Sequence, residues 1–156
     1  MSIRRKSASI GAVLALMLWL LGSVAMAEDA GLPVTSSFGW RVHPISGDYK
    51  FHSGVDLGYS YGTGIAALFD GVVVQVGDFG DGYGNQVLLY HPAIDAYTRY
   101  GHCSCVYVGA DADVAAGDII GTVGSTGYST GPHLHLEYIV ATDAGYEYAN
   151  PLMLWE

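Results

Sequence analysis

The most informative stretch of the chain is Gly131-Pro132-His133-Leu134-His135-Leu136-Glu137-Tyr138. Polar and apolar side chains alternate along its second half. Because successive side chains of a β-strand point to opposite faces, the two histidines and Glu137 share one face, while the leucines and Tyr138 point to the core. The stretch therefore predicts a half-buried strand that carries two imidazoles and a carboxylate on one face.

The rest of the chain consists of short β-type runs separated by clusters of Gly, Asp, Asn and Pro. We expect strands at residues 65–68, 72–76, 86–90, 97–100, 106–108, 119–123 and 134–140. Turn clusters lie at residues 77–85 and 124–132. No window of ten or more residues has the apolar period of an amphipathic helix. The patterns predict an all-β fold, a small single domain of antiparallel sheets without internal repeats.

The first 27 residues differ from the rest in composition. A basic start at residues 4–6 precedes an apolar run at residues 10–24, and Ala25-Met26-Ala27 places small residues at the −3 and −1 positions of a cleavage site. This order predicts a secretory signal peptide cut after Ala27, with residues 28–156 exported to the periplasm or to the extracellular space and cell wall. The alternative is a retained membrane anchor, although a spanning helix needs roughly 20 apolar residues.

The charge balance excludes several classes of partner. The chain has 6 Lys and Arg against 15 Asp and Glu, a formal charge of −9, and loss of residues 1–27 would leave three bases and a charge of −12. Nucleic-acid binding needs a basic surface that this composition lacks. The same charge gives no attraction to anionic lipid, so we expect no membrane partner after signal cleavage. We also expect a monomer.

The histidines carry the chemistry. His52 lies four residues before Asp56, and His133 and His135 form a His-x-His pair. Each pattern alone is more often a solvated or hydrogen-bonded group, but their co-occurrence favours convergence on one ion. Two imidazoles and one carboxylate, with a fourth position open to water, are the ligand set of a catalytic zinc ion rather than of a closed structural one. The chain has no His-Glu-x-x-His motif, so the general base must be a different residue.

Four blocks follow one another along the chain: Ser37-Phe38-Gly39-Trp40-Arg41-Val42-His43-Pro44, His52-Ser53-Gly54-Val55-Asp56-Leu57, Tyr100-Gly101-His102 and Gly124-Ser125-Thr126-Gly127-Tyr128-Ser129-Thr130-Gly131-Pro132-His133-Leu134-His135. In this order, and over residues 34–152, the chain resembles the lysostaphin/LytM-type peptidases, the M23 zinc metallopeptidases. The resemblance implies a small antiparallel β domain with a narrow substrate groove. It also implies endopeptidase cleavage of peptide bridges in bacterial peptidoglycan.

The resemblance further implies roles for individual residues. His52, Asp56 and His135 resemble the ligands of one zinc ion per chain. His102 and His133 resemble two histidines beside the metal that handle protons and the developing oxyanion. Zinc lowers the pKa of a bound water to about 7, and this water would attack the peptide carbonyl while a neutral imidazole accepts its proton. Which of His102 and His133 is the general base stays open.

Other residues near the predicted site have supporting roles. Arg41 either contacts a substrate carboxylate or forms a structural ion pair, and Tyr49 is a candidate hydroxyl donor near the oxyanion. Glu137 either accepts a hydrogen bond from a ligand imidazole or is exposed. Segments 58–64 and 124–131 are rich in glycine, and we expect both to form groove walls where an extended peptide approaches the backbone.

The two cysteines depart from the family pattern, in which an apolar residue commonly follows the isolated histidine. Cys103 and Cys105 admit three interpretations: a disulfide in a local bend, two buried thiols, or a metal role. Alternate Cα atoms of an extended strand lie close to the upper limit for bridging, roughly 6.8 Å. A disulfide would therefore require a distorted strand, which would also move His102.

Three classes of function are consistent with these features. The first is an exported zinc endopeptidase that hydrolyses the peptide cross-links or stems of peptidoglycan. The second is a catalytically weak domain of the same fold that binds or activates another cell-wall hydrolase, although such domains typically lack ligands and all five positions are filled here. The third is a zinc peptidase that trims terminal D-amino acids, whose ligands are spaced differently.

Overall fold

The computed structural model describes residues 31–43 and 45–156. The strands are β1 (Val34–Ser36), β2 (Gly39–Val42), β3 (Tyr49–His52), β4 (Val55–Leu57), β5 (Gly64–Ala66), β6 (Gly71–Gly77), β7 (Asn85–His91), β8 (Ala96–Val106), β9 (Asp113–Val114), β10 (Ile119–Val123), β11 (Leu134–Thr142) and β12 (Gly145–Ala149). A 3-10 helix, η1 (Pro151–Trp155), ends the chain. The predicted signal peptide lies outside the described residues. No helix within them is long and apolar enough to span a membrane.

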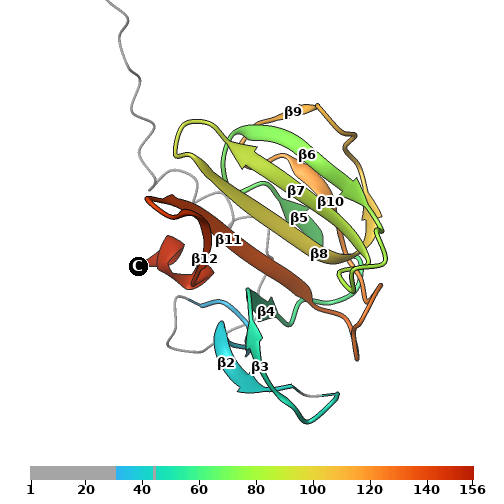
Figure 1. Cartoon of the computed structure of the whole chain (residues 1–156). Helices are drawn as coiled ribbons and strands as arrows, with labels where there is room; N and C mark the ends of the chain where they lie inside the picture. The colour runs from blue at the N-terminus through green and yellow to red at the C-terminus, as the bar shows by residue number, and fades with distance from the viewer. Residues whose placement is uncertain (1–30, 44) are drawn as a thin grey trace, which may run out of the picture.

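Ten strands form one sheet in which every pairing is antiparallel, with the order β1-β4-β11-β8-β7-β6-β9. Strand β10 pairs with β5 and β8, and β12 pairs with β11. The β2–β3 hairpin forms a separate sheet and lies below β4 and β11 in the view of Figure 1. The predicted all-β, antiparallel fold is confirmed.

All seven predicted runs lie in or next to strands, but two of them are not separate. The runs 97–100 and 106–108 were expected to be two strands, whereas β8 continues from Ala96 to Val106. His102 adopts a left-handed conformation with φ +60°, and the pairing of β8 shifts register on both sides of this point. An irregularity of this kind bends a strand without ending it. The other strands, β1 to β4, β9 and β12, have at most five residues and were not predicted.

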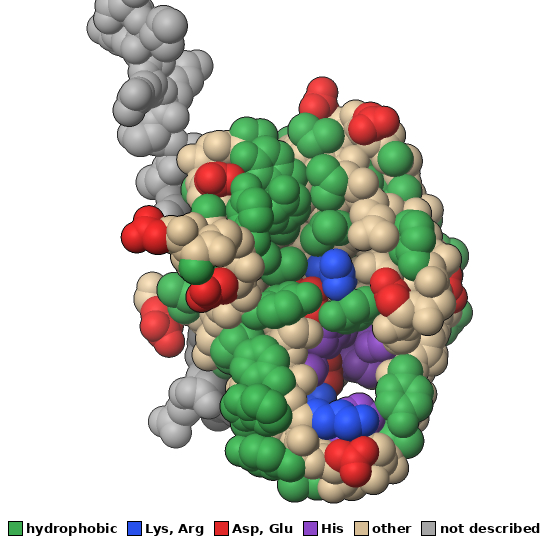
Figure 2. All heavy atoms as spheres, in the orientation of Figure 1, with side chains coloured by type: hydrophobic (Ala, Val, Ile, Leu, Met, Phe, Trp, Pro, Cys, Tyr) green, Lys and Arg blue, Asp and Glu red, His purple; other side chains and the backbone are tan. Residues whose placement is uncertain are grey.

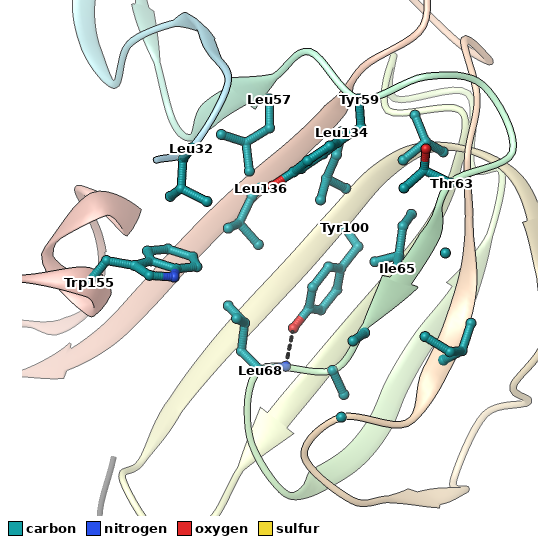
Figure 3. Close-up of a pocket in the computed structure, with 16 residues that line it drawn as sticks. Leu32, Leu57, Tyr59, Thr63, Ile65, Leu68, Tyr100, Leu134, Leu136 and Trp155 are labelled. Atoms are coloured by element: carbon teal, nitrogen blue, oxygen red, sulfur yellow. Dashed lines mark hydrogen bonds between the residues drawn. The ribbon is translucent and has the colours of Figure 1, made fainter. Parts of the chain in front are cut away.

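The apolar face of the main sheet packs as expected. Leu134 and Leu136 are buried, and Tyr100 of the neighbouring strand is fully buried beside them. The hydroxyl oxygen of Tyr100 accepts a hydrogen bond from the Leu68 amide (Figure 3) and another from the Thr98 hydroxyl, both at 3.0 Å. Burial raises the pKa of Tyr100 to about 12. A buried hydroxyl without partners would cost stability, and both contacts prevent this.

An apolar cavity of about 220 Å³ lies on this core face, between β11 and β8 on one side and β5 and β10 on the other (Figure 3). Tyr59, Thr63 and Gly64 line it together with Trp155 of η1. The expectation that segment 58–64 forms a wall of the histidine groove is therefore wrong. The segment connects β4 to β5, and none of its residues lines the histidine cleft.

Neither cysteine is in a disulfide. Cys103 is buried in the core and Cys105 is exposed, both as free thiols, so the disulfide interpretation is wrong and only one of the two thiols is buried. Burial raises the pKa of Cys103 to about 11, which keeps this thiol protonated and unreactive.

Candidate metal centre

Two short strands and the longer β11 bring the predicted ligands together. His52 ends β3, Asp56 lies in the middle of β4, and His135 is the second residue of β11, where it pairs directly with Asp56. His135 Nδ1 lies 2.8 Å from Asp56 Oδ1. His52 Nε2 lies 3.2 Å from the same oxygen and 3.1 Å from His135 Nδ1. The three side chains form a compact group of possible metal ligands.

The remaining ring nitrogens fix the tautomers of both imidazoles. His52 Nδ1 lies 2.9 Å from the Ser37 carbonyl oxygen, which only accepts, so this nitrogen carries the hydrogen. His135 Nε2 lies 3.2 Å from a carboxylate oxygen of Glu137 and donates in the same way. In the neutral rings, His52 Nε2 and His135 Nδ1 therefore each carry a lone pair, and the two atoms face each other and the carboxylate of Asp56.

Three converging lone pairs repel one another unless a cation lies between them. Zn–N and Zn–O bonds of about 2.0–2.1 Å in a tetrahedral site put ligand atoms roughly 3.4 Å apart. The observed separations of 2.8, 3.1 and 3.2 Å are only slightly shorter. Two imidazoles and one carboxylate are also the donor set that zinc accepts in catalytic sites. The residues present therefore fit a zinc ion.

A proton can relieve the same repulsion when no metal is bound. Burial opposes the charged form of His135, but its hydrogen bonds to Asp56 and Glu137 prevail and raise its pKa. Burial likewise opposes ionisation of Asp56, yet the hydrogen bonds with His135 and His52 hold the pKa of this carboxyl well below its usual range. Protons and metal ions thus compete for one site.

His102 and His133 lie next to the ligand group. Their ring centroids are 4.6 Å apart, and His133 Nε2 is 3.7 Å from Asp56 Oδ1. His102 Nδ1 donates to the Thr126 carbonyl at 2.7 Å, and His133 Nδ1 donates to the Gly131 carbonyl at 2.9 Å. In both neutral rings the Nε2 atom is therefore a proton acceptor.

The backbone of His102 is held in a left-handed conformation, which non-glycine residues adopt at a cost of roughly 1–3 kcal/mol. Its amide donates to the Tyr83 carbonyl at 2.7 Å, and its side chain is fixed by Thr126. Burial, reinforced by the nearby charges of His133 and His135, lowers the pKa of His102 to about 4 despite the Thr126 hydrogen bond. His102 is consequently a neutral imidazole at physiological pH.

The five residues lie in a cleft of about 310 Å³ between the main sheet and the β2–β3 hairpin. Figure 2 shows the histidines at the bottom of a hollow, with Lys and Arg side chains at two of its sides. Segment 124–131 forms a wall through Tyr128, Ser129 and Thr130, as expected. Asp81, Gly82 and Tyr83 form another wall, so the turn cluster at 77–85 replaces segment 58–64 in this role.

The hairpin places Arg41 and Tyr49 on opposite faces. Arg41 lines the cleft, and one of its guanidinium nitrogens lies 3.8 Å from Asp56 Oδ2 in an ion pair. Tyr49 is 68% exposed and stacks on Trp40 with ring centroids 5.5 Å apart. The structure thus brings Arg41 to the predicted ligand Asp56 but places Tyr49 on the hairpin surface outside the cleft lining.

Glu137 has no exposed surface, and the hydrogen-bonded interpretation of this residue is confirmed. Its Oε1 atom accepts hydrogen bonds from the Ser53 hydroxyl and, at 2.6 Å, from the Tyr83 hydroxyl. Its Oε2 atom lies 3.4 Å from a guanidinium nitrogen of Arg99, whose guanidinium also lies over the Tyr83 ring at 4.4 Å. Burial opposes ionisation, but the bonds from His135, Ser53 and Tyr83 lower the pKa of Glu137.

Sequence patterns did not reveal Tyr83, Arg99, Thr126 or Ser37. Arg99 lies three residues before His102, an odd interval that strand periodicity assigns to the opposite face, so the pattern gave no signal for it. Tyr83 lies within a glycine-rich turn, where strand periodicity gives no information. Ser37 and Thr126 hold the histidines through their carbonyl groups, which every residue has, so side-chain patterns cannot identify them.

Comparison with known proteins agrees with this geometry. The family description "Peptidase family M23" matches residues 50–148. The DD-carboxypeptidase/endopeptidase Mpg of Neisseria meningitidis serogroup B is 45% identical over 104 residues, which are 67% of this chain and 24% of Mpg. The peptidoglycan DD-endopeptidase ShyC of Vibrio cholerae serotype O1 is 41% identical over 101 residues, which are 64% of this chain and 23% of ShyC. The chain spans about a quarter of the length of these curated relatives.

A solved structure extends the similarity to almost the whole fold. The catalytic domain of lysostaphin from Staphylococcus simulans, described as an antimicrobial peptidase, superposes with a TM-score of 0.71 at 31% identity. The alignment covers 88% of this chain and 96% of that domain. Because the family description matches more than half of the sequence and the fold agrees with a solved member, the chain belongs to peptidase family M23.

Proposed function

We propose that this protein is an exported zinc endopeptidase that hydrolyses peptide cross-links of bacterial peptidoglycan. The observation that carries the proposal is the convergence of the lone pairs of His52 and His135 on the carboxylate of Asp56, with two further histidines beside them. One zinc ion held by these three residues would activate a water molecule and polarise the scissile carbonyl.

The environment of His102 supports a role for it that differs from that of His133. His102 is neutral at physiological pH and presents an unprotonated Nε2 atom beside the proposed ligands, so we assign it the role of proton acceptor. His133 would then carry the proton that stabilises negative charge on the carbonyl oxygen and later reaches the leaving amine. Arg41 is our candidate for a substrate carboxylate, and Tyr49 for contact with substrate outside the cleft.

The names of two relatives support one class of peptide bond as the substrate of this protein. Mpg and ShyC are both described as DD-peptidases, so we propose a cross-link between D-amino acids as the substrate. The alternative, a catalytically weak domain that activates another wall hydrolase, is less well supported because all five positions of the site are filled.

We also propose the domain boundaries and the location. Residues 1–27 would be the signal peptide, and residues 28–156 the catalytic domain, acting as a monomer in the periplasm or at the cell wall. Amino-terminal sequencing of the protein recovered from the source cells should begin at Glu28. A protein that begins at Met1 and sediments with membranes would support a retained anchor instead.

The decisive experiment for the reaction is a digestion of purified peptidoglycans with different cross-bridges. We expect the protein to release fragments from peptidoglycan with direct D,D cross-links, and mass spectrometry to identify the cleaved bond. Zinc content measured on the same sample checks that the site is loaded. Release only from glycine-bridged peptidoglycan would change the bond assignment. No release from either, with zinc bound, would favour the non-catalytic alternative.

A further inference from the structure

The face of the sheet that carries His135 continues as a row of aromatic residues. In β11, Glu137 and Ile139 follow His135 at two-residue intervals and therefore point to the same side. Strand register then aligns Ile139 with Tyr97 of β8 and with Tyr148 of β12, and aligns Tyr97 with Tyr90 of β7. We call Tyr90, Tyr97, Tyr148 and the adjacent Tyr146 the tyrosine row.

Two tyrosines of the row, Tyr90 and Tyr97, are half-buried and the other two are exposed, and ring contacts and hydrogen bonds hold the row together. Tyr146 is 50% exposed, and Tyr148 is also exposed. The rings of Tyr90 and Tyr97 are 4.9 Å apart, and those of Tyr97 and Tyr146 are 5.0 Å apart. Asp95 accepts hydrogen bonds from the hydroxyls of Tyr90 at 3.0 Å and Tyr146 at 2.7 Å. Figure 2 shows exposed hydrophobic side chains over the sheet next to the hollow that holds the histidines.

We propose that the tyrosine row is a subsite for the sugar rings of peptidoglycan, continuous with the catalytic cleft. This inference rests on the proposed function and extends its substrate from the peptide to the glycan strand that bears the peptide. Between the cleft and the row lies the Arg99–Glu137 pair, so one uninterrupted sheet face links the two.

The chemistry of the row fits a neutral sugar better than other occupants. A pyranose ring presents C–H groups to an aromatic face and hydroxyl groups to its edge, and the row supplies both aromatic faces and phenolic hydroxyls. Asp95 is the charged residue in hydrogen-bond contact with the row, and the chain as a whole is strongly acidic. Anionic polymers and anionic lipid headgroups would therefore be repelled, whereas uncharged amino-sugar rings would not.

The spacing also fits a peptide stem. Ile139 lies four residues beyond His135, which corresponds to about 14 Å along a strand at roughly 3.4 Å per residue. An extended peptide of about four residues has the same length. A stem bound in the cleft by its distal end would therefore deliver its sugar to the tyrosine row.

The test separates sugar binding from cleavage. A peptide-free oligomer of N-acetylglucosamine is titrated against the purified protein while tyrosine signals are followed by NMR. Activity is measured in parallel on whole sacculi and on a soluble, sugar-free, cross-linked peptide. The variants are Tyr146→Ala and Tyr148→Ala on the exposed strand β12, and Tyr97→Phe, which keeps the ring. The control is Tyr107→Ala, which removes an exposed tyrosine outside the row.

We expect the oligosaccharide to shift the signals of the row. Tyr146→Ala and Tyr148→Ala should lower oligosaccharide binding and activity on sacculi at least fivefold, and leave cleavage of the sugar-free peptide unchanged. Tyr97→Phe and Tyr107→Ala should retain both oligosaccharide binding and activity on sacculi.

Other outcomes would contradict the inference. Equal loss of activity on the sugar-free peptide would show that the row binds peptide. Concentration-dependent dimerisation that the variants lose would show that a second copy of the chain covers the row. Either result, or no oligosaccharide shift, overturns the inference. Failure of the wild type to cleave either substrate instead contradicts the proposed function.

Discussion

Glu137 accepts the Nε2 hydrogen of His135 at 3.2 Å from a position with no exposed surface. This contact orients the ring so that Nδ1 faces Asp56 and His52. The carboxylate also receives the hydroxyls of Ser53, which follows a ligand in the sequence, and of Tyr83, which lies in the cleft wall. Glu137 therefore links β11, the residue that follows His52 and a cleft wall at one buried point.

The first prediction concerns this link. Glu137→Gln preserves shape but replaces the charged acceptor with an amide, so the hydrogen bond that holds His135 weakens. Metal affinity should fall by about 10- to 100-fold, which is typical for loss of a carboxylate behind a ligand histidine. Chelator competition measures the affinity, with Glu147→Gln on the exposed strand β12 as the matched control. Unchanged zinc affinity in Glu137→Gln would show that the backbone alone orients His135.

The second prediction separates ligands from proton carriers. His135→Ala should abolish zinc binding and activity, because it removes one of three converging donors. His102→Ala and His133→Ala should keep about one zinc per chain but lower kcat by roughly 10²- to 10⁴-fold, the usual contribution of general acid–base groups. Elemental analysis gives the zinc content of each variant. Loss of metal in His102→Ala or His133→Ala would place that residue among the ligands.

Much of the site was predictable because its residues are side chains in regular patterns. The His-x-His pair and His-x-x-x-Asp predicted the three side chains that converge as possible metal ligands, and period-2 alternation placed Glu137 on the correct face. The longer strands were predictable for the same reason, since β6, β7, β10 and β11 have at least five residues of strong β pattern. A pattern needs several residues to repeat, so the three- and four-residue strands that hold His52 and Asp56 escaped prediction.

Other features depend on contacts that a sequence does not contain. Strand β8 continues through His102 because a left-handed residue there absorbs a shift in register. Strand periodicity cannot indicate such a shift. The glycines of segments 58–64 and 124–131 look alike in the sequence, yet one borders the core cavity and the other the cleft. The difference depends on what each segment packs against in the folded protein.

The third prediction concerns the packing of the two cleft walls. Gly127 has φ +71°, and a Cβ atom there would overlap the backbone of Gly84 in the opposite wall. Gly127→Ala should therefore destabilise the fold by about 2 kcal/mol or more, and lower Tm by roughly 5–10 °C. Activity should fall as well, because the neighbouring Thr126 fixes His102. Thermal unfolding is compared with Gly131→Ala, where a Cβ atom meets open space. Equal Tm values for both variants would contradict tight contact between the walls.

The fourth prediction concerns stability and pH. Because the pKa of His102 is lowered from 6.5 to about 4, the unfolded chain binds a proton between these values that the folded protein does not. Metal-free protein should therefore lose stability through His102 as pH falls across this window, by about 3 kcal/mol in total. Denaturant unfolding of wild type and His102→Ala isolates the effect, since His135 is present in both. If the free energy of unfolding depends on pH in the same way for both proteins, the pKa of His102 is not lowered in the folded state.

The last prediction concerns the rate at acid pH. His102 stays neutral down to about pH 4, so its protonation should not limit the reaction at mildly acid pH. The ligands His52 and His135 must be unprotonated to bind zinc, and the raised pKa of His135 in the metal-free site makes protons strong competitors there. The acid limb of kcat/KM should therefore follow zinc occupancy, and it should move to lower pH as free zinc is raised in steps. Rates and zinc content measured on the same samples test this coupling. An acid limb that stays in place while the site remains saturated would instead assign it to a proton acceptor that titrates near neutral pH.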